Sequence, residues 1–161
     1  MIRPATPADG AAVAELWNPV IRDTLVTFTT QLHAAGDVER MIAGKQEAGL
    51  PFLVAQAGDA VLGFASYGPF RNGPGYRYTM EHTVILAPEG RGRGIGRAIM
   101  QRLEDHARTG GVHSLIGGIS AANPAGRAFH AALGYLEVAV LPEVGYKWGQ
   151  WLDLVLMQKK L

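Results

Sequence analysis

Hydrophobic residues recur every three or four positions in several stretches of the chain, which is the spacing of one face of an α-helix. Val13, Leu16 and Trp17 predict a first helix, after which Pro19 permits a break. The same periodicity predicts three further helices, over residues 37–48, 95–107 and 124–133. Each of these is soon followed by glycine, the residue that most often ends a helix.

Shorter runs of apolar or alternating residues predict strands between and after these helices. They lie at residues 2–5, 52–56, 61–67, 78–86, 114–119, 135–140 and 151–158. The turn residues at 57–60 indicate a hairpin between the second and third of these runs. Because strands and helices are mixed along the chain, we expect an α/β fold in which helices flank a central sheet.

Composition limits the size and the partners of the protein. A chain of 161 residues suits one domain, residues 1–161, with a substantial core. Lys and Arg number 15 against 14 Asp and Glu, so the overall charge does not indicate binding to nucleic acid or to a membrane surface. No apolar run approaches the length of a membrane span and no signal peptide is evident, so we expect a cytoplasmic protein.

Cysteine and histidine usage bears on the chemistry. Without cysteine the chain has no disulfide, thiol nucleophile or thiolate metal site. The five histidines lack the close spacing of metal ligands, and we expect no metal.

The most informative segment is Arg91-Gly92-Arg93-Gly94-Ile95-Gly96, between the predicted strand at 78–86 and the predicted helix at 95–107. Glycines allow positive φ and bring backbone N–H groups close to a ligand, and the N-terminus of the following helix attracts anions. Arginines at 91, 93 and 97 add positive charge. The pattern predicts a phosphate-binding loop, although a tight strand-to-helix turn would use similar residues.

Spacing separates this loop from two better-known phosphate sites. A P-loop closes with Gly-Lys followed by Ser or Thr, which the chain lacks. A dinucleotide-binding loop needs its third glycine where this chain has Arg97, and it needs an acidic residue at the end of the next strand, here 114–119, where none is present. The pattern Arg-x-x-Gly-x-Gly after a strand resembles instead the acyl-CoA loop of the GCN5-related N-acetyltransferases.

The resemblance extends over nearly the whole chain, from residue 2 to residue 158. Within the superfamily it points to the phosphinothricin and methionine sulfoximine acetyltransferases, through residues 78–84, 123–125, 133–135 and 144–153. It implies the GNAT fold, with a mixed and mostly antiparallel sheet, and acetyl-CoA as co-substrate. It also implies a homodimer, which the aromatic residues at 144–153 independently favour.

Several residues would hold the cofactor if the resemblance is valid. The loop and Arg97 would contact the pyrophosphate. The backbone of Val84, Ile85 and Leu86 would pair with the pantetheine arm as an added strand does. Asn123 would contact the same arm, although an asparagine that opens a helix is equally expected as an N-cap.

Two residues are candidates for proton transfer. Only an unprotonated amine attacks a thioester, and Glu81, on the strand that leads to the loop, matches the proposed base of the family. A solvated glutamate or a structural ion pair is the alternative. His130 stands where relatives carry a residue that can protonate the CoA thiolate. The alternative is a surface histidine on a helix, with its hydrogen bonds satisfied and no catalytic role.

The remaining candidates concern the acceptor. Arg71, with Asn72 and Gly73, matches a loop whose arginine holds the amino-acid carboxylate in the resembling enzymes. Phe28 and Tyr78 match pocket walls there, although aromatic residues at such positions are as often part of the core.

These residues predict acetyl transfer from acetyl-CoA to the α-amine of a small amino acid or analogue, by direct attack. Two alternatives are kept: the same chemistry on a polyamine, an aminoglycoside or a protein N-terminus, and a CoA-binding module without turnover.

Overall fold

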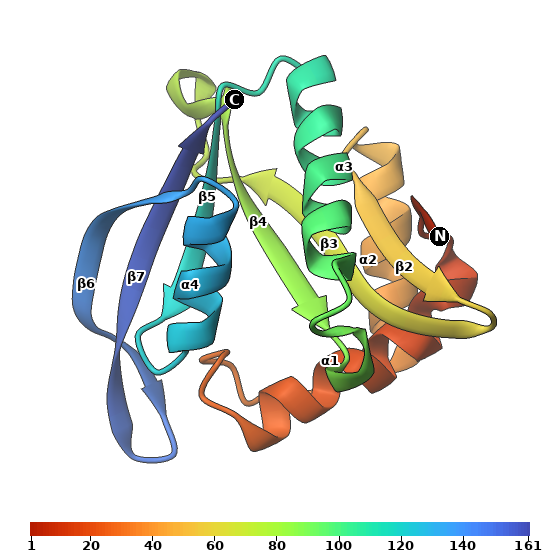
Figure 1. Ribbon diagram of the computed structural model, residues 1–161, viewed down its shortest axis with the longest axis horizontal. Coiled ribbons are helices and arrows are strands. Elements are labelled where there is room, and N and C mark those ends of the chain that lie inside the picture. The colour runs from red at the N-terminus through yellow and green to blue at the C-terminus, as the bar shows by residue number, and fades with distance from the viewer.

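The computed structural model describes residues 1–161 as one seven-stranded sheet with helices on both faces (Figure 1). The strands are β1 (Ile2–Pro4), β2 (Phe52–Ala57), β3 (Ala60–Pro69), β4 (Thr79–Leu86), β5 (Ser114–Ser120), β6 (Leu136–Lys147) and β7 (Gln150–Lys160). The helices are α1 (Gly10–Asp23), α2 (Ala35–Glu47), α3 (Ile95–Thr109) and α4 (Pro124–Ala132), with short 3-10 turns at Pro7–Asp9, Pro74–Tyr76 and Pro88–Gly90. The predicted α/β fold class is confirmed.

The strand order is β1-β2-β3-β4-β5-β7-β6, and every neighbouring pair is antiparallel except β4 and β5. The parallel pairing joins only the first halves of these two strands, Thr79 to His82 with Ser114 to Gly117. Beyond His82 the strands separate, as Figure 1 shows. The second half of β4 therefore has β3 on one edge and no strand on the other.

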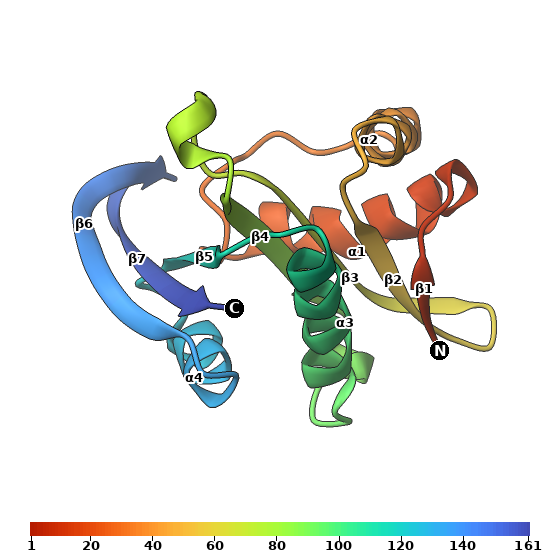
Figure 2. The same cartoon turned by 90° about the horizontal axis from the view of Figure 1, so that it is seen from above.

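Two hydrophobic cores hold the helices on the sheet, α1 and α2 on one face and α3 and α4 on the other (Figure 2). β4 contributes to both because successive side chains point to opposite faces. Val84 packs against the core that contains Leu103 of α3, whereas Ile85 joins the core that contains Val13 and Val38 of α1 and α2.

Helix α1 is longer than the sequence predicted, because it continues through Pro19 to Asp23. Proline removes one helical N–H donor, but Val13 and Ile21 on either side of it are completely buried. Their packing outweighs the missing hydrogen bond.

A capping box formed by Thr6 and Asp9 stands at the 3-10 turn that leads into α1. Asp9 Oδ2 accepts from the backbone N–H of Thr6 at 2.7 Å. Its two carboxylate oxygens also accept from Arg3, at 2.8 and 2.7 Å.

The last two strands form a long hairpin at the edge of the sheet. Its exposed large apolar residues are Leu136, Val138, Val140, Leu141, Val144, Tyr146, Trp148 and Trp151. None of the helices is both long enough and apolar enough to cross a membrane.

Candidate active site

A groove of about 440 Å³ opens where β4 and β5 separate, bordered by the N-terminus of α3 and by α4. It contains most of the residues predicted to hold a cofactor: Val84, Ile85, Leu86, Arg91, Gly92, Gly94, Gly96, Arg97 and Asn123. Two predicted residues do not line it. The Arg93 guanidinium donates to the carbonyl of Glu89 at 3.3 Å, and Ile95 packs against the α3 core.

The glycine loop has the backbone that its sequence predicted. Gly92 and Gly94 have φ of 68° and 76°, where other residues are strained, and a Cβ on either would point into open space. Gly94 is the N-cap of α3, and no side chain caps this helix. The first N–H groups of α3 are therefore available to an anion.

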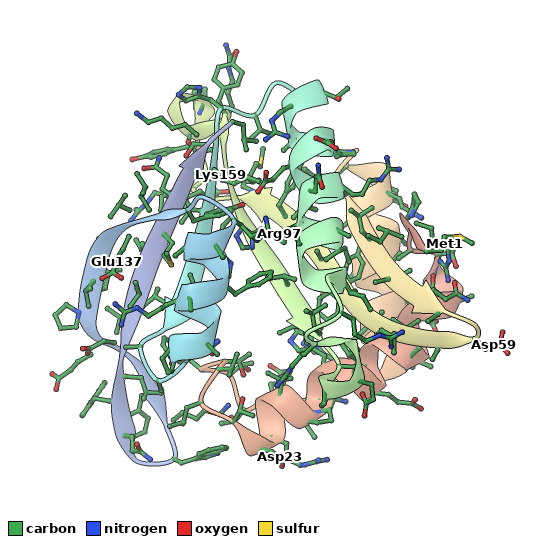
Figure 3. The ribbon with its side chains drawn as sticks, viewed as in Figure 1. Met1, Asp23, Asp59, Arg97, Glu137 and Lys159 are labelled. Carbon is green, nitrogen blue, oxygen red and sulfur yellow. The ribbon has the colours of Figure 1, made fainter.

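Gly96 serves a different purpose. A Cβ there would lie 2.8 Å from the Phe129 ring and 2.9 Å from Leu86. This glycine allows α3 to pack closely against α4 and β4. Arg97 also connects the two helices, since its Nη2 donates to the carbonyl of Ala132 at 3.4 Å (Figure 3).

The wall that β4 presents to the groove is backbone. β3 pairs with Val84, Ile85 and Leu86 from one side only, while β5 has already separated. An extended amide-containing chain would find an unpaired strand edge there, as in β-strand addition.

A second cavity, of about 260 Å³, joins the groove on the α1 side of the sheet. The residues common to both are Val26, Val84, Ile85, Asn123 and His130. A smaller cavity of about 100 Å³ continues from the second one, and Trp17, Glu81 and Thr83 line both. The second cavity therefore adjoins both the groove and the smallest cavity, and Glu81 lies between the two smaller spaces.

Glu81 has the properties of a base that is not already engaged. Partial burial raises the pKa of its carboxyl group, and no hydrogen bond or ion pair offsets this shift. A Cβ on Gly118, across the strand gap, would lie 3.1 Å from Glu81 Oε1. The glycine thus keeps the space beside the carboxylate open, and the ion-pair alternative does not apply.

Asn123 and His130 lie on α4 at the junction of the groove and the second cavity. Asn123 is the N-cap of this helix, since its Oδ1 accepts from the Gly126 N–H at 2.9 Å. His130 Nδ1 lies 2.7 Å from the Gly126 carbonyl. A carbonyl only accepts, so the proton is on Nδ1 and Nε2 carries a lone pair. Burial also lowers the pKa of His130, which keeps the ring neutral.

His82 is a site residue that the sequence did not single out. It is buried beside His130, and neither of its ring nitrogens has a hydrogen-bond partner. Burial, with a further contribution from His130, lowers the pKa of His82 to about 3. Its position next to Glu81 on a strand could not predict this environment, because the His82 ring stacks on the ring of His130, which belongs to α4.

The loop after β3 does not reach these cavities. Arg71, Asn72, Gly73 and Tyr78 are exposed and line none of the three spaces. The Arg71 guanidinium lies 5.7 Å from the centre of the Phe70 ring. Within this chain the structure therefore does not bring Arg71 and Glu81 together.

Of the predicted acceptor residues, Phe28 lines the second cavity together with Glu81. The structure instead places a different cation, Lys45 on α2, near Glu81. It lines the smallest cavity with Glu81, and its Nζ donates to the Tyr67 carbonyl at 2.6 Å. Gly68 is the β3 partner of Glu81, and a Cβ on it would lie 2.8 Å from Lys45 Nζ. Nothing in the helical pattern of α2 marks this lysine.

Comparison with known proteins adds to this geometry. Residues 17–135 match the sequence profile of the Acetyltransferase (GNAT) family. An L-amino acid N-acyltransferase, MnaT, of Escherichia coli (strain K12) is 39% identical over 160 residues, covering 99% of this chain and 93% of the relative. An L-methionine sulfoximine/L-methionine sulfone acetyltransferase of Salmonella typhimurium is 38% identical, with coverages of 99% and 94%.

Solved structures are similarly close. A ribosomal-protein-alanine N-acetyltransferase from Brucella melitensis superimposes with a TM-score of 0.96 at 40% identity, covering 100% of this chain and 99% of the other. The yncA protein of Salmonella typhimurium with acetyl-CoA superimposes with a TM-score of 0.95 at 37% identity, covering 100% of this chain and 93% of the other. A phosphinothricin acetyltransferase from Sinorhizobium meliloti in complex with acetyl-CoA gives 0.93 at 30%, with coverages of 100% and 88%.

Proposed function

The chain belongs to the acetyltransferase (GNAT) family, and on that premise we propose that it acetylates the α-amine of a small amino acid or close analogue, with acetyl-CoA as donor. Methionine sulfoximine, methionine sulfone and phosphinothricin are the acceptors of choice, because relatives are named for them. The observation that carries the proposal is the unpaired Glu81 carboxylate in the cavity that adjoins the groove.

The groove fits acetyl-CoA in three respects. The uncapped N-terminus of α3 and its positive-φ glycines suit a pyrophosphate, with Arg91 and Arg97 alongside. The free edge of β4 suits the pantetheine amides. When bound, acetyl-CoA supplies an activated acetyl group at the junction between the cavities.

Glu81 in the second cavity and His130 at the junction of that cavity with the groove then divide the proton transfers. Glu81, directly or through water, takes a proton from the bound ammonium, and the free amine attacks the thioester carbonyl. As the new C–N bond forms and the C–S bond breaks, a second nitrogen-bound proton must reach the thiolate. His130 is suited to relay it, because neutral Nε2 first accepts the proton and then returns it. No metal ion takes part in this proposal.

The acceptor carboxylate requires a cation, and two are available. Arg71 is the one implied by resemblance, and it acts from an exposed loop outside the cavities. Lys45 acts from within, where burial lowers the pKa of its ammonium. Substitution of each, described in the Discussion, distinguishes them.

We further propose that the protein is a homodimer that works in the cytoplasm, where acetyl-CoA is available. The argument for a second copy is the hairpin: β6 is an edge strand, and its exposed face is mainly apolar. An edge of this kind is well suited to a symmetric contact with itself. Light scattering at micromolar concentration tests it, and a single monomeric species would contradict it.

The function is tested by thiol release from acetyl-CoA over a panel of amines. We expect turnover with the three named acceptors and none with polyamines or aminoglycosides. A second candidate is a protein N-terminus, favoured by the Brucella melitensis structure, so an alanine-starting peptide belongs in the panel. The small volumes of these two cavities, about 260 and 100 Å³, argue for the smaller acceptor. CoA binding without thiol release for any amine would indicate the non-catalytic module.

A further inference from the structure

Lys147, the last residue of β6, is an ammonium group enclosed by backbone carbonyls. The residue is only 1% exposed. Its Nζ donates to the carbonyls of Ile21, Thr24 and Thr27 at 2.7, 2.7 and 2.8 Å. These three acceptors lie more than a hundred residues away in sequence, and together they use all the donors of the ammonium.

The three carbonyls mark the end of α1 and the turn that follows it. Ile21 belongs to the last turn of α1, where carbonyls lack helical partners and the helix dipole favours a cation. Thr24 and Thr27 belong to the segment after the helix. Lys147 thereby fixes the direction in which the chain leaves α1, beside the β6–β7 hairpin (Figure 1).

The fixed segment is a wall of the proposed acceptor site. Residues 26–29 line the cavity that contains Glu81. Phe28 in this segment is also seated on β6, because a Cβ on Gly145 would lie 2.5 Å from its ring. Two residues of one strand, Lys147 and Gly145, thus hold the wall, one through its charge and the other by leaving room.

We propose that Lys147 is a positioning residue for acceptor binding: it holds segment 24–29 so that Phe28 closes the acceptor cavity opposite Glu81. The proposal deepens the proposed function and rests on it for the identity of the acceptor. Lys147 itself lines none of the three cavities, so it acts through Phe28 and not by contact with substrate.

The test compares Lys147→Met with a matched control, Lys160→Met, which removes an exposed lysine at the end of β7. Methionine keeps the length of the side chain and leaves the carbonyls without a donor. We expect the KM for the acceptor to rise about tenfold or more in Lys147→Met, since misplaced binding groups are costly. Thr24 and Val26 also line the groove, so the KM for acetyl-CoA should rise as well, but much less, because the glycine loop and Arg97 on the other side of the groove belong to segments that Lys147 does not hold. The control should match the wild type.

A double-mutant cycle separates positioning from general stability. If Lys147 acts through Phe28, Lys147→Met adds little to the acceptor KM in a Phe28→Leu background. Gly145→Ala displaces the ring without touching the lysine and should reproduce the selective rise. Fully additive effects, or equal rises in both KM values, would overturn the proposal.

Hydrogen exchange provides a readout that does not depend on which amine is accepted. The amides of residues 24–29 should exchange faster in Lys147→Met, while those of α3 and β4 keep wild-type rates. If the wild type acetylates no amine, the proposed function fails, but this measurement still tests whether Lys147 holds segment 24–29. Unchanged amide exchange rates at residues 24–29 would refute this role of Lys147 even in an active enzyme.

Discussion

The imidazole rings of His82 and His130 stack almost parallel, with centroids 5.0 Å apart and an interplanar angle of 10°. One ring comes from β4 and the other from α4, and the Tyr135 ring meets both edge-on. Burial lowers the pKa of each histidine, so the pair is neutral at neutral pH. A proton relayed by His130 therefore enters at the Nε2 lone pair.

We predict that His130→Gln lowers kcat by about 10²-fold with little effect on the KM for acetyl-CoA, as expected for loss of a proton relay. Steady-state kinetics with saturating acceptor measures this. His113→Gln, at an exposed position, is the control and should leave kcat unchanged. Full activity in His130→Gln would assign the histidine to packing alone.

Glu81→Gln should lower kcat by about 10²-fold with a smaller change in KM, because general base catalysis typically contributes 10²–10⁴. The exposed Glu47→Gln is the matched control. If both variants behave alike, Glu81 is not the base.

The pH profile of kcat follows from the same two groups. Both act in their deprotonated forms, so activity falls as pH is lowered. Burial raises the pKa of Glu81 and lowers that of His130, so the acidic limb should lie above the ordinary pKa of a glutamate. An acidic limb well above pH 7 would point to a different titrating group.

Gly94→Val should weaken CoA binding by about tenfold or more while the fold survives, because valine is strained at φ of 76° and its side chain would occupy the open space that the pyrophosphate needs. Titration calorimetry with CoA measures this. Gly44→Ala is the control, since it lies in α2 with open space around its Cα. Wild-type affinity in Gly94→Val would contradict the phosphate loop.

Two variants, Lys45→Met and Arg71→Ala, test which cation binds the acceptor carboxylate. Loss of a charge-assisted hydrogen bond should raise the acceptor KM by about tenfold or more. From the position of Lys45 beside Glu81, we expect the larger rise in Lys45→Met. The reverse order would mean that the Arg71 loop reaches the acceptor when substrate binds.

Asp9→Asn tests the start of α1. The Arg3 side chain, assisted by Thr6, lowers the pKa of Asp9 from 3.8 to about 2. A carboxyl group with a depressed folded pKa stabilises the fold above its unfolded pKa, and this contribution disappears as pH falls from about 4 to about 2. We expect Asp9→Asn to lose about 2 kcal/mol at pH 7 by urea unfolding and little at pH 2. A pH-independent loss would mean that charge is not the cause.

The sequence by itself determined the features that depend on neighbouring residues. The periodicities placed nearly every helix and strand. The glycine spacing predicted a loop with positive φ, because that conformation at Gly92 and Gly94 is favoured by those residues themselves. Glu81 and Asn123 were predicted from their places in motifs; Asn123 lines the groove, and Glu81 lines the cavity beside it.

Only the tertiary structure decided how distant segments meet. The separation of β4 from β5 depends on sheet register, and the role of Gly96 depends on Phe129, a residue of another helix. The stacking of His82 on His130 and the hydrogen bond from Lys147 to the Ile21 carbonyl likewise join segments that are far apart in sequence. Local patterns carry no record of such contacts, because side-chain packing is fixed only when the elements come together. For the same reason a motif could not predict that Arg71 would lie outside the cavities that contain Glu81, or that Lys45 would line one of them.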